Sequence, residues 1–298
     1  MSQTREWFDA LPDTVAAVTH HWGLRLGPPF QPGGVGSWVA PGTDAAGRDV
    51  VVKLRWCYPE AVAEASALAA WDGGGAAHLL DAMTDADGPL PSNSDALLLE
   101  RCRPGHALGL VAPPLEQDVV IAGLLRRLHQ TPPPDDVPTL TSMCDTWADE
   151  TQARYDALWS AGEATPLSRA EVDDGLALLR SLASEPGRAA LLCTDLHAEN
   201  VVSAQREPWL VIDPHPHVGD PAYDLLQHLL NCRDRLLAEP RWLVDRMARL
   251  LDVDPSRARR WLYARCVQES LESPWLVAVL AALRPVSFPG SQRTHSRS

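Results

Sequence analysis

The spacing of apolar and polar residues divides the chain at about residue 102. Before that point, short apolar runs bounded by glycine and proline predict β-strands. The expected strands cover residues 24–26, 37–40, 49–56 and 96–100, with a shorter apolar run at 77–80. Glycine and proline crowd between the first two runs, which favours a hairpin.

After residue 102, apolar residues recur at the spacing of amphipathic helices. Ser168 followed by Glu171 forms a capping box, and Asp254-Pro255 is a second helix start. The expected helices cover 116–129, 140–158, 168–182, 242–251 and a segment opened by Asp254, besides two earlier helices over 5–20 and 59–71. Strands followed by helices indicate an α+β chain. We therefore expect two lobes, residues 1–102 and 103–298, joined near Arg101–Pro104.

Polar residues that can carry chemistry gather around a second predicted hairpin. Two apolar runs, 199–203 and 208–212, flank the polar turn Ala-Gln-Arg-Glu. Asp195 and Asn200 precede the first run, and Asp213 closes the second. The hairpin should therefore return Asp213 to the side of Asp195 and Asn200.

One amide and two carboxylates at one point suit phosphoryl transfer. One carboxylate would orient the attacking hydroxyl and accept its proton, and the other oxygens would bind magnesium together with the nucleotide phosphates. Lys53 is unusual because it lies in the middle of the β-branched run over 49–56. Taken alone, such a lysine most often occupies the solvent-facing side of a strand.

The charge balance narrows the range of partners. The chain has 39 acidic and 26 basic residues and a net charge of −13, which argues against nucleic acid as a partner. The acidity either attracts a cationic partner or only keeps the protein soluble. We expect a small-molecule substrate that is cationic or polyhydroxylated, and a monomeric protein.

Cysteine usage and the start of the chain bear on localisation. The six cysteines form no CxxC pair and no zinc-finger spacing, so neither a disulfide framework nor structural zinc is expected. The first residues lack the basic start and apolar core of an export signal. No apolar run approaches the roughly 20 residues that span a bilayer. These features predict a cytoplasmic protein with no membrane partner.

The segment around the second hairpin resembles the catalytic region of the aminoglycoside phosphotransferases. The matching motifs are Asp195-Leu196-His197 with Asn200, then Ile212-Asp213-Pro214, then Gly219-Asp220-Pro221-Ala222-Tyr223-Asp224-Leu225. They are most similar to the branch of streptomycin 6-phosphotransferases and hydroxyurea phosphotransferases. The likeness extends upstream to residues 64–80 and 96–105. It implies a protein-kinase-like fold with a small β-rich N-lobe and a helical C-lobe.

The resemblance also implies roles for the matching residues. Asp195 would be the catalytic base, and Asn200 and Asp213 would be the magnesium ligands. Lys53, held by Glu64, would bind the α- and β-phosphates of ATP.

Further roles follow from the same likeness. The loop over the triphosphate would comprise Gly33, Gly34, Gly36 and Ser37. The hinge Glu100, Arg101 and Cys102 would meet the adenine edge through its backbone. Asp220 would brace the catalytic loop, and Asp224 would start or cap the next helix. One departure is Cys193-Thr194, where the family usually has His-Gly, and it bears on efficiency more than on mechanism.

Several other residues admit two interpretations. His197, His215 and His217 could act as a base or as metal ligands, but loop packing or substrate contact is favoured over transition-metal binding. Trp261 and Trp275 could touch the substrate or pack in the core. Acidic residues of the helical lobe could hold a cationic substrate or form solvated surface, and the candidates are Asp145, Asp149, Glu150, Glu269 and Glu272.

Together these features predict an ATP- and magnesium-dependent phosphotransferase that acts on a hydroxyl of a small polar molecule. The resemblance implies an aminoglycoside or aminocyclitol antibiotic, such as streptomycin, as the substrate, and resistance as the outcome. One alternative is a kinase for another compound, such as a sugar, a nucleoside antibiotic or a hydroxyurea-like molecule. The other is a pseudokinase that binds nucleotide without turnover. A protein kinase is disfavoured, because the sequence has no His-Arg-Asp, Asp-Phe-Gly or Ala-Pro-Glu segment.

Overall fold

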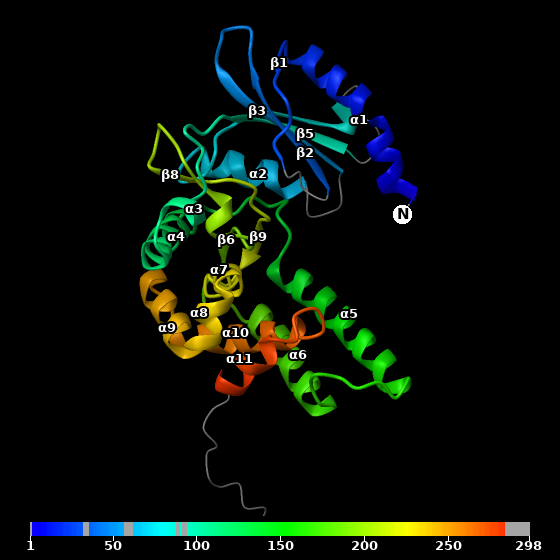
Figure 1. The fold of residues 1–298 in the computed structure, drawn as a ribbon, viewed down its shortest axis with the longest axis vertical. Helices are drawn as coiled ribbons and strands as arrows, with labels where there is room; N and C mark the ends of the chain where they lie inside the picture. The colour runs from blue at the N-terminus through cyan, green and yellow to red at the C-terminus, as the bar shows by residue number, and fades with distance from the viewer. Residues whose placement is uncertain (1, 32–35, 57–61, 88–89, 91–93, 284–298) are drawn as a thin grey trace, which may run out of the picture.

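An antiparallel sheet forms the smaller of two lobes (Figure 1). The computed structural model describes residues 2–31, 36–56, 62–87, 90 and 94–283. The strands run in the order β1-β2-β3-β5-β4. They are β1 (Arg25–Leu26), β2 (Ser37–Thr43), β3 (Asp49–Trp56), β4 (Leu79–Thr84) and β5 (Ser94–Glu100). The predicted hairpin of the first two strands and the strand over 49–56 are confirmed.

Strand β4 is longer than the apolar run at 77–80 indicated. It continues to Thr84 although only Met83 within it is buried. Pairing with β5 extends the strand, since Asp81 lies opposite Leu98 and Met83 opposite Ala96. An edge strand is held by backbone hydrogen bonds on one side, so its side chains need not be apolar.

The central strands present alternate residues to two helices on opposite faces of the sheet. Helix α1 (Ser2–His21) buries Trp7 and Val18 in one apolar cluster, which also contains Val50, Val52 and Leu54 of β3. Helix α2 (Val62–Trp71) belongs to the other cluster, with Leu97 and Leu99 of β5. Because side chains alternate along a strand, Lys53 and Arg55 face the side of α2.

The larger lobe is helical, as predicted, and each predicted helix within it is present. Its longer helices are α4 (Pro114–Leu128), α5 (Leu140–Ser160), α6 (Arg169–Ser184), α9 (Pro240–Leu251) and α10 (Pro255–Gln268). The capping box of Ser168 and Glu171 forms at the start of α6. Asp254 caps α10 by accepting a hydrogen bond from the Ser256 amide.

Several short elements of this lobe were not predicted. They are α3 (Leu108–Val111), β6 (Ala190–Leu192), β9 (His217–Gly219), α7 (Leu226–Asn231), α8 (Arg233–Ala238) and α11 (Leu276–Leu283). Elements this short carry little periodicity of their own. They matter because β6 and β9 pair with each other on either side of the segment that contains Asp195, Asn200 and Asp213.

The second predicted hairpin is confirmed and joins the two lobes. It comprises β7 (Val201–Ser203) and β8 (Trp209–Val211). The Ala77 amide donates to the Val211 carbonyl at 2.8 Å, and the Val211 amide donates to the Gly75 carbonyl at 2.9 Å. The hairpin that precedes Asp213 is therefore hydrogen-bonded to the sheet-rich lobe.

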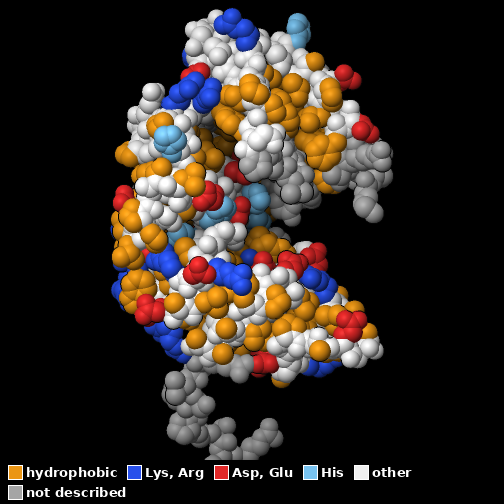
Figure 2. All heavy atoms as spheres, viewed as in Figure 1, with side chains coloured by type: hydrophobic (Ala, Val, Ile, Leu, Met, Phe, Trp, Pro, Cys, Tyr) orange, Lys and Arg blue, Asp and Glu red, His pale blue; other side chains and the backbone are white. Residues whose placement is uncertain are grey.

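The surface is hollowed between the lobes, with acidic and histidine side chains at the inner end of the hollow (Figure 2). Within the described residues, no helix is both long enough and apolar enough to cross a membrane.

Candidate active site

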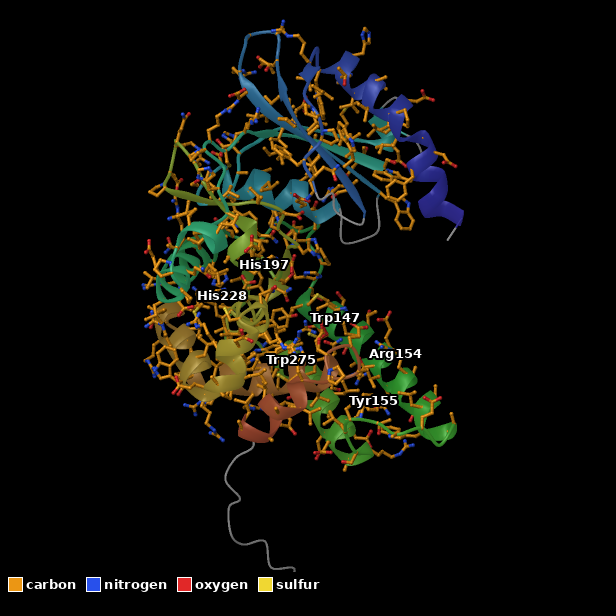
Figure 3. The ribbon with its side chains drawn as sticks, in the orientation of Figure 1. Trp147, Arg154, Tyr155, His197, His228 and Trp275 are labelled. Carbon is orange, nitrogen blue, oxygen red and sulfur yellow. The ribbon has the colours of Figure 1, made fainter. Side chains whose placement is uncertain are left out.

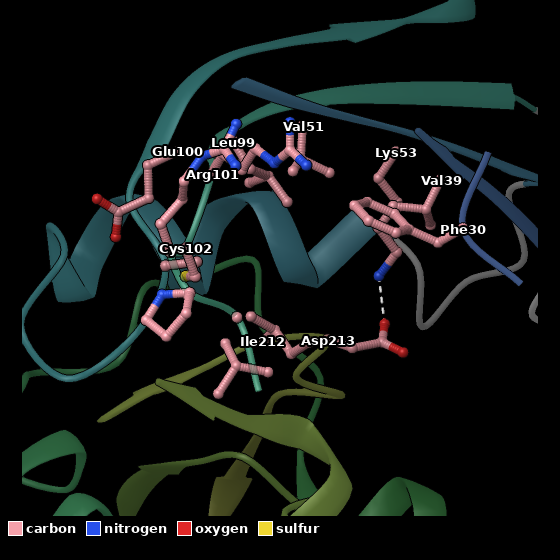
Figure 4. A pocket seen from close by; sticks show the side chains of 15 residues that line it. Phe30, Val39, Val51, Lys53, Leu99, Glu100, Arg101, Cys102, Ile212 and Asp213 are labelled. Carbon is pink, nitrogen blue, oxygen red and sulfur yellow. Dashed lines mark hydrogen bonds and ion pairs between the residues drawn. The ribbon is translucent and has the colours of Figure 1, made fainter. Parts of the chain in front are cut away.

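Lys53 is a buried ion-pair centre. Its ammonium donates to both carboxylate oxygens of Glu64, at 2.9 and 2.7 Å, and also to Asp213 (Figure 4). The residue is 5% exposed, so the solvent-facing interpretation of this lysine is wrong. Burial lowers the pKa of Lys53, but attraction to Glu64 and Asp213 outweighs burial and leaves that pKa raised. Strand β3, helix α2 and the segment that follows the β7–β8 hairpin thus meet at the Lys53 ammonium.

A second cation fixes Glu64 from the other side. Arg55 pairs with Glu64 and, through the other edge of its guanidinium, with Asp95. Sequence reasoning overlooked Arg55 and Asp95. The signal was available, because Arg55 is two residues beyond Lys53 and therefore faces the same side of β3. Glu64 is 2% exposed between the two cations, so its carboxylate has a single orientation.

The loop between β6 and β7 carries Asp195 and Asn200. The Asn200 side-chain amide donates to the Asp195 backbone carbonyl at 3.1 Å and to its carboxylate at 3.4 Å. The Ile212 amide donates to the Asn200 carbonyl at 2.9 Å, which brings the residue before Asp213 against the loop. Burial raises the pKa of Asp195, the nearby histidines oppose this, and the charge of Asp213 raises the pKa further. The three residues therefore lie together, as the hairpin predicted.

The structure corrects the roles expected for Asp220 and Asp224. Asp224 is fully buried and accepts hydrogen bonds from the backbone amides of Cys193 and Thr194, at 2.9 and 2.6 Å. Its other contact is with His129, at 2.8 Å. Asp224 therefore braces the catalytic loop, the role predicted for Asp220.

Asp220 instead connects the turn after β9 to helix α10. It accepts from the Ala222 amide at 2.9 Å and from the Trp261 indole at 2.6 Å, and it pairs with Arg257. Asp224 does not begin a helix, because residues 221–225 form a turn and α7 begins only at Leu226. That turn points Asp224 back toward the loop.

Most aromatic and acidic candidates of the helical lobe have partners within that lobe. Trp261 is fully buried behind Asp220, so it is a core residue and not a substrate contact. The Arg233 guanidinium lies over the ring of the half-buried Trp275, which is farther from the sheet-rich lobe than His197 (Figure 3). Four of the five acidic candidates form ion pairs: Asp145 and Asp149 with Arg180, Glu272 with Arg154, and Glu269 with Arg265.

His197 and His217 fit the loop-packing interpretation, whereas the His215 side chain is exposed. His197 Nδ1 accepts from the Glu199 amide at 3.4 Å, which caps the turn before Asn200. His217 Nδ1 lies 3.4 Å from the Thr194 hydroxyl. Among the described residues, no group of three or more His, Cys, Asp or Glu side chains could hold a metal ion.

A largely apolar cavity of about 310 Å³ opens beside Lys53 and Asp213 (Figure 4). Its lining includes Phe30, Val39, Val51, Leu99 and Ile212, together with the hinge residues Glu100, Arg101 and Cys102. Gly36 and Ser37 lie where β2 begins, and the Gly36 carbonyl accepts from the Trp56 amide at 3.1 Å. Gly33 and Gly34 lie outside the described residues. A largely apolar cavity whose lining includes the Lys53 cation suits a nucleotide base and its phosphates.

Cys102 offers a chemical probe of this cavity. Burial, and then the charge of Glu100, raises the pKa of the Cys102 thiol to about 11. We expect its alkylation by iodoacetamide to be slow at neutral pH and to accelerate roughly tenfold per pH unit as the thiolate forms. Saturating ATP should block the reaction at Cys102 but not at the partly exposed Cys232, which is absent from the cavity lining. Peptide mass spectrometry reads both sites, and equal labelling of Cys102 with and without ATP would contradict the nucleotide assignment.

Thr194 occupies the position where glycine is expected, and its backbone explains that preference. Its φ is +45°, in the left-handed region that costs a side chain about 1–2 kcal/mol. The Thr194 hydroxyl donates to the His215 carbonyl, which offsets part of that cost. We expect Thr194→Ala to lower the free energy of unfolding by about 1 kcal/mol, because it keeps the strain and loses the bond.

Thr194→Gly is the matched comparison, because it loses the same bond and also removes the strain. Its unfolding free energy should return close to that of the parent chain in urea titrations. Equal losses in the two variants would mean that the backbone at Thr194 is not strained.

A family model described as aminoglycoside/hydroxyurea antibiotic resistance kinase matches residues 25–273. The chain belongs to this family. It is 37% identical to hydroxyurea phosphotransferase of Kitasatospora aureofaciens over 269 residues, which cover 90% of this chain and 74% of the relative. It is 34% identical to streptomycin 6-kinase of Streptomyces griseus over 277 residues, covering 90% of this chain and 84% of the relative.

Solved structures of more distant kinases confirm the fold. The chain matches aminoglycoside phosphotransferase APH(4)-Ia in a ternary complex with AMP-PNP and hygromycin B, with a TM-score of 0.62 and 16% identity, over 90% of this chain and 96% of that one. It matches choline kinase LicA from Streptococcus pneumoniae with a TM-score of 0.57 and 14% identity, over 92% and 93% of the two chains. The predicted α+β, protein-kinase-like fold and the predicted enzyme class, a phosphotransferase, are thus confirmed.

Proposed function

We propose that this kinase transfers the γ-phosphoryl group of ATP to a hydroxyl of a small polar molecule, with Asp195 as the base that accepts the hydroxyl proton. The observation that carries the proposal is the convergence of Lys53 and Asp213, at the mouth of an apolar cavity, with Asp195 and Asn200. Phosphoryl transfer relies on positioning and electrostatic stabilisation, and these groups supply both.

The nucleotide would lie in the cavity beside β3. Lys53, oriented by Glu64, would bind the α- and β-phosphates, and the Glu100 and Cys102 backbone would meet the base. Gly34, Gly36 and Ser37 would cover the triphosphate. This assignment gives residues 1–102 the nucleotide-binding role and residues 103–298 the catalytic loop and the acceptor pocket.

Asn200 and Asp213 are a suitable donor set for magnesium. They offer an amide oxygen and a carboxylate, and magnesium commonly takes one or two such ligands and completes its shell with phosphates and water. In this structure the Asp213 carboxylate forms an ion pair with Lys53. Magnesium, when bound, would neutralise charge on the triphosphate. Lys53 would then be free to pair with phosphate.

The leading substrate class is an aminoglycoside or aminocyclitol antibiotic. The streptomycin 6-kinase and hydroxyurea phosphotransferase relatives support a small polar acceptor. A hydroxyurea-like compound is the second candidate, because the ion pairs of Asp145, Asp149, Glu269 and Glu272 reduce the free negative charge available for a polycation. We further propose a monomeric enzyme that works in the cytoplasm, where ATP is available.

The pseudokinase alternative finds little support in the loop geometry. Cys193 takes part through its backbone, since its amide donates to Asp224 and its carbonyl accepts from the Asp195 and His215 amides. The side chain at this position does not contact the other active-site candidates through any hydrogen bond in the described residues. These backbone hydrogen bonds do not depend on the side chain, so cysteine in place of the usual histidine still allows them to hold the loop.

ADP release in the presence of magnesium and ATP tests the function. Streptomycin, hygromycin B and hydroxyurea are added one at a time, with no acceptor as the blank and the Asp195→Asn variant as the control. Acceptor-dependent ADP release that vanishes in Asp195→Asn supports the proposal and identifies the substrate. Stabilisation by Mg-ATP without ADP release, for these acceptors and for a panel of sugars and nucleosides, would favour the pseudokinase.

A further inference from the structure

One arginine in the turn between β7 and β8 uses every hydrogen-bond donor that its side chain has. Arg206 lies in the polar turn Ala-Gln-Arg-Glu, and a guanidinium carries five N–H groups. The structure gives them five hydrogen bonds, to the carboxylates of Glu100 and Glu207 and to the carbonyls of Gly73 and Ala76. The side chain is 38% exposed, yet these contacts leave it a single orientation.

Two of these hydrogen bonds reach the hinge between the lobes. Arg206 Nη2 donates to Glu100 Oε1 at 2.6 Å, and Arg206 Nε donates to Glu100 Oε2 at 3.2 Å. Glu100 Oε1 also accepts from the His78 amide at 3.1 Å. Glu100 ends β5 and lines the cavity beside Lys53, at the end opposite that lysine (Figure 4). Arg206 therefore holds a residue of the cavity wall from outside the cavity.

The other hydrogen bonds connect the turn to the loop after α2 and to α4. Arg206 Nη1 donates to the Gly73 carbonyl at 2.6 Å, and Nη2 donates to the Ala76 carbonyl at 3.0 Å. A Cβ atom on Gly73 would lie 3.1 Å from Arg206 Nη2, so the guanidinium packs closely on this glycine. Glu207 accepts from Arg206 and pairs with Arg127 of α4. We call the five hydrogen bonds of Arg206 the Arg206 contact network.

Backbone hydrogen bonds hold both edges of the same hairpin. On the β8 edge, Val211 is hydrogen-bonded to the loop over residues 75–77. On the β7 edge, the Ser203 carbonyl accepts from the Gly105 amide at 3.0 Å. The hairpin therefore lies between the loop after α2 and the segment after the hinge, and Arg206 connects these two parts of the chain at the turn.

We infer that Arg206 is a positioning residue for nucleotide binding, which holds Glu100 and thereby the hinge at the wall of the cavity. The inference rests on the proposed placement of ATP in that cavity. Arg206 acts through Glu100 and not on the nucleotide, because it is not among the lining residues in the described part of the chain. A lysine cannot reproduce its contacts, since an ammonium has three donors and no planar fork.

Arg206→Lys tests the contact network, because it keeps the charge and loses the fork. Hydrogen exchange is measured without nucleotide on peptides that cover residues 73–79. The His78 amide in this segment donates to Glu100, and we expect it to exchange roughly tenfold faster in the variant. Exchange in α5 should stay unchanged, which separates a local effect from a general loss of stability.

Arg259→Lys is the matched control. Arg259 also donates two hydrogen bonds to one carboxylate, that of Asp245, and its side chain is 37% exposed, against 38% for Arg206. This pair connects α10 to α9 within the larger lobe, so the control removes an equivalent fork away from the hinge. Exchange at residues 73–79 should equal that of the parent protein.

Calorimetry with Mg-ADP measures the consequence for the cavity. Arg206→Lys should weaken Mg-ADP binding by roughly tenfold, as expected for the loss of a charged hydrogen bond at a partly exposed site. Arg259→Lys should bind Mg-ADP as the parent does. In ADP-release assays the KM for ATP should rise by a similar factor in Arg206→Lys, while kcat changes by less than about twofold.

Glu100→Gln tests the route through the hinge. It should weaken Mg-ADP binding by roughly the same factor as Arg206→Lys, and the double variant should bind little more weakly than the weaker single variant, because both substitutions disrupt one contact. If the two effects multiply in the double variant, Arg206 does not act through Glu100 and the inference is wrong.

The two measurements separate this inference from the proposed function. Unchanged exchange at residues 73–79 in Arg206→Lys, or equally faster exchange in α5, overturns the contact network whether or not an acceptor is phosphorylated. Faster local exchange with parent-like Mg-ADP affinity overturns the role in nucleotide binding. A parent protein that does not bind Mg-ADP contradicts the proposed function and the nucleotide-binding role together, while the exchange result still decides whether Arg206 holds the hinge.

Discussion

Asp195→Asn is expected to lower kcat by roughly 10²–10⁴-fold, the usual contribution of a general base. The substitution keeps the size of the side chain but replaces one carboxylate oxygen by an NH₂ group, and so removes the group that accepts the hydroxyl proton. Asn200 can still donate to the backbone carbonyl of residue 195, so the loop should keep its shape. Mg-ATP binding, measured by calorimetry, should stay close to that of the parent protein because Lys53 and Asp213 are untouched.

The pH dependence of kcat adds a second readout. Burial raises the pKa of Asp195, and only the ionised form can accept a proton. The parent kcat should therefore fall as pH is lowered through that raised pKa, and the variant should lack this acid limb. Asp245→Asn, which breaks the surface pair with Arg259, is the control and should leave both rate and profile unchanged. A parent-like rate in Asp195→Asn would remove the base from the mechanism.

The sequence predicted the fold well where elements are long or carry their own boundary signals. The capping box at Ser168 and the Asp254-Pro255 start placed α6 and α10, and the β-branched run over 49–56 placed β3. The length of β4 was underestimated, because its residues after Leu80 are held by pairing with β5 and not by apolar side chains. Short strands such as β6 and β9 were not predicted, because each is defined by its pairing with the other and not by a pattern of its own.

Local spacing predicted which candidate site residues lie together, but it did not predict the residues that support them. Asp195 and Asn200 precede one hairpin and Asp213 follows it, so their convergence could be deduced from the chain direction alone. Lys53 and Glu64 are eleven residues apart, on a strand and the helix that follows it. The partners of Asp224 and Asp220 come from α4, the catalytic loop and α10, and no sequence spacing reports contacts between such distant segments.

Asp224→Asn tests the corrected assignment and carries the second large effect. The Asp224 carboxylate accepts from two backbone amides and contacts His129, and all of these groups are buried. An asparagine would turn an NH₂ group toward one of these donors and leave it unsatisfied. We expect a loss of roughly 3 kcal/mol in the free energy of unfolding, together with a fall in kcat of about 10–100-fold, because a misplaced catalytic group loses reactivity steeply. Urea titration and ADP-release kinetics well below the melting temperature measure the two effects.

Asp220→Asn is the matched control, because it also removes a buried carboxylate from the same turn. It breaks the contacts with Arg257 and Trp261, so its stability should fall by a similar amount. Asp220 makes no hydrogen bond to the catalytic loop in the described part of the chain, so kcat of the folded protein should change little. The two variants thus share a stability loss and differ in rate. If Asp220→Asn lost more kcat than Asp224→Asn, the prediction would be wrong. Asp220 and not Asp224 would then hold the catalytic loop, through α10 instead of through α4.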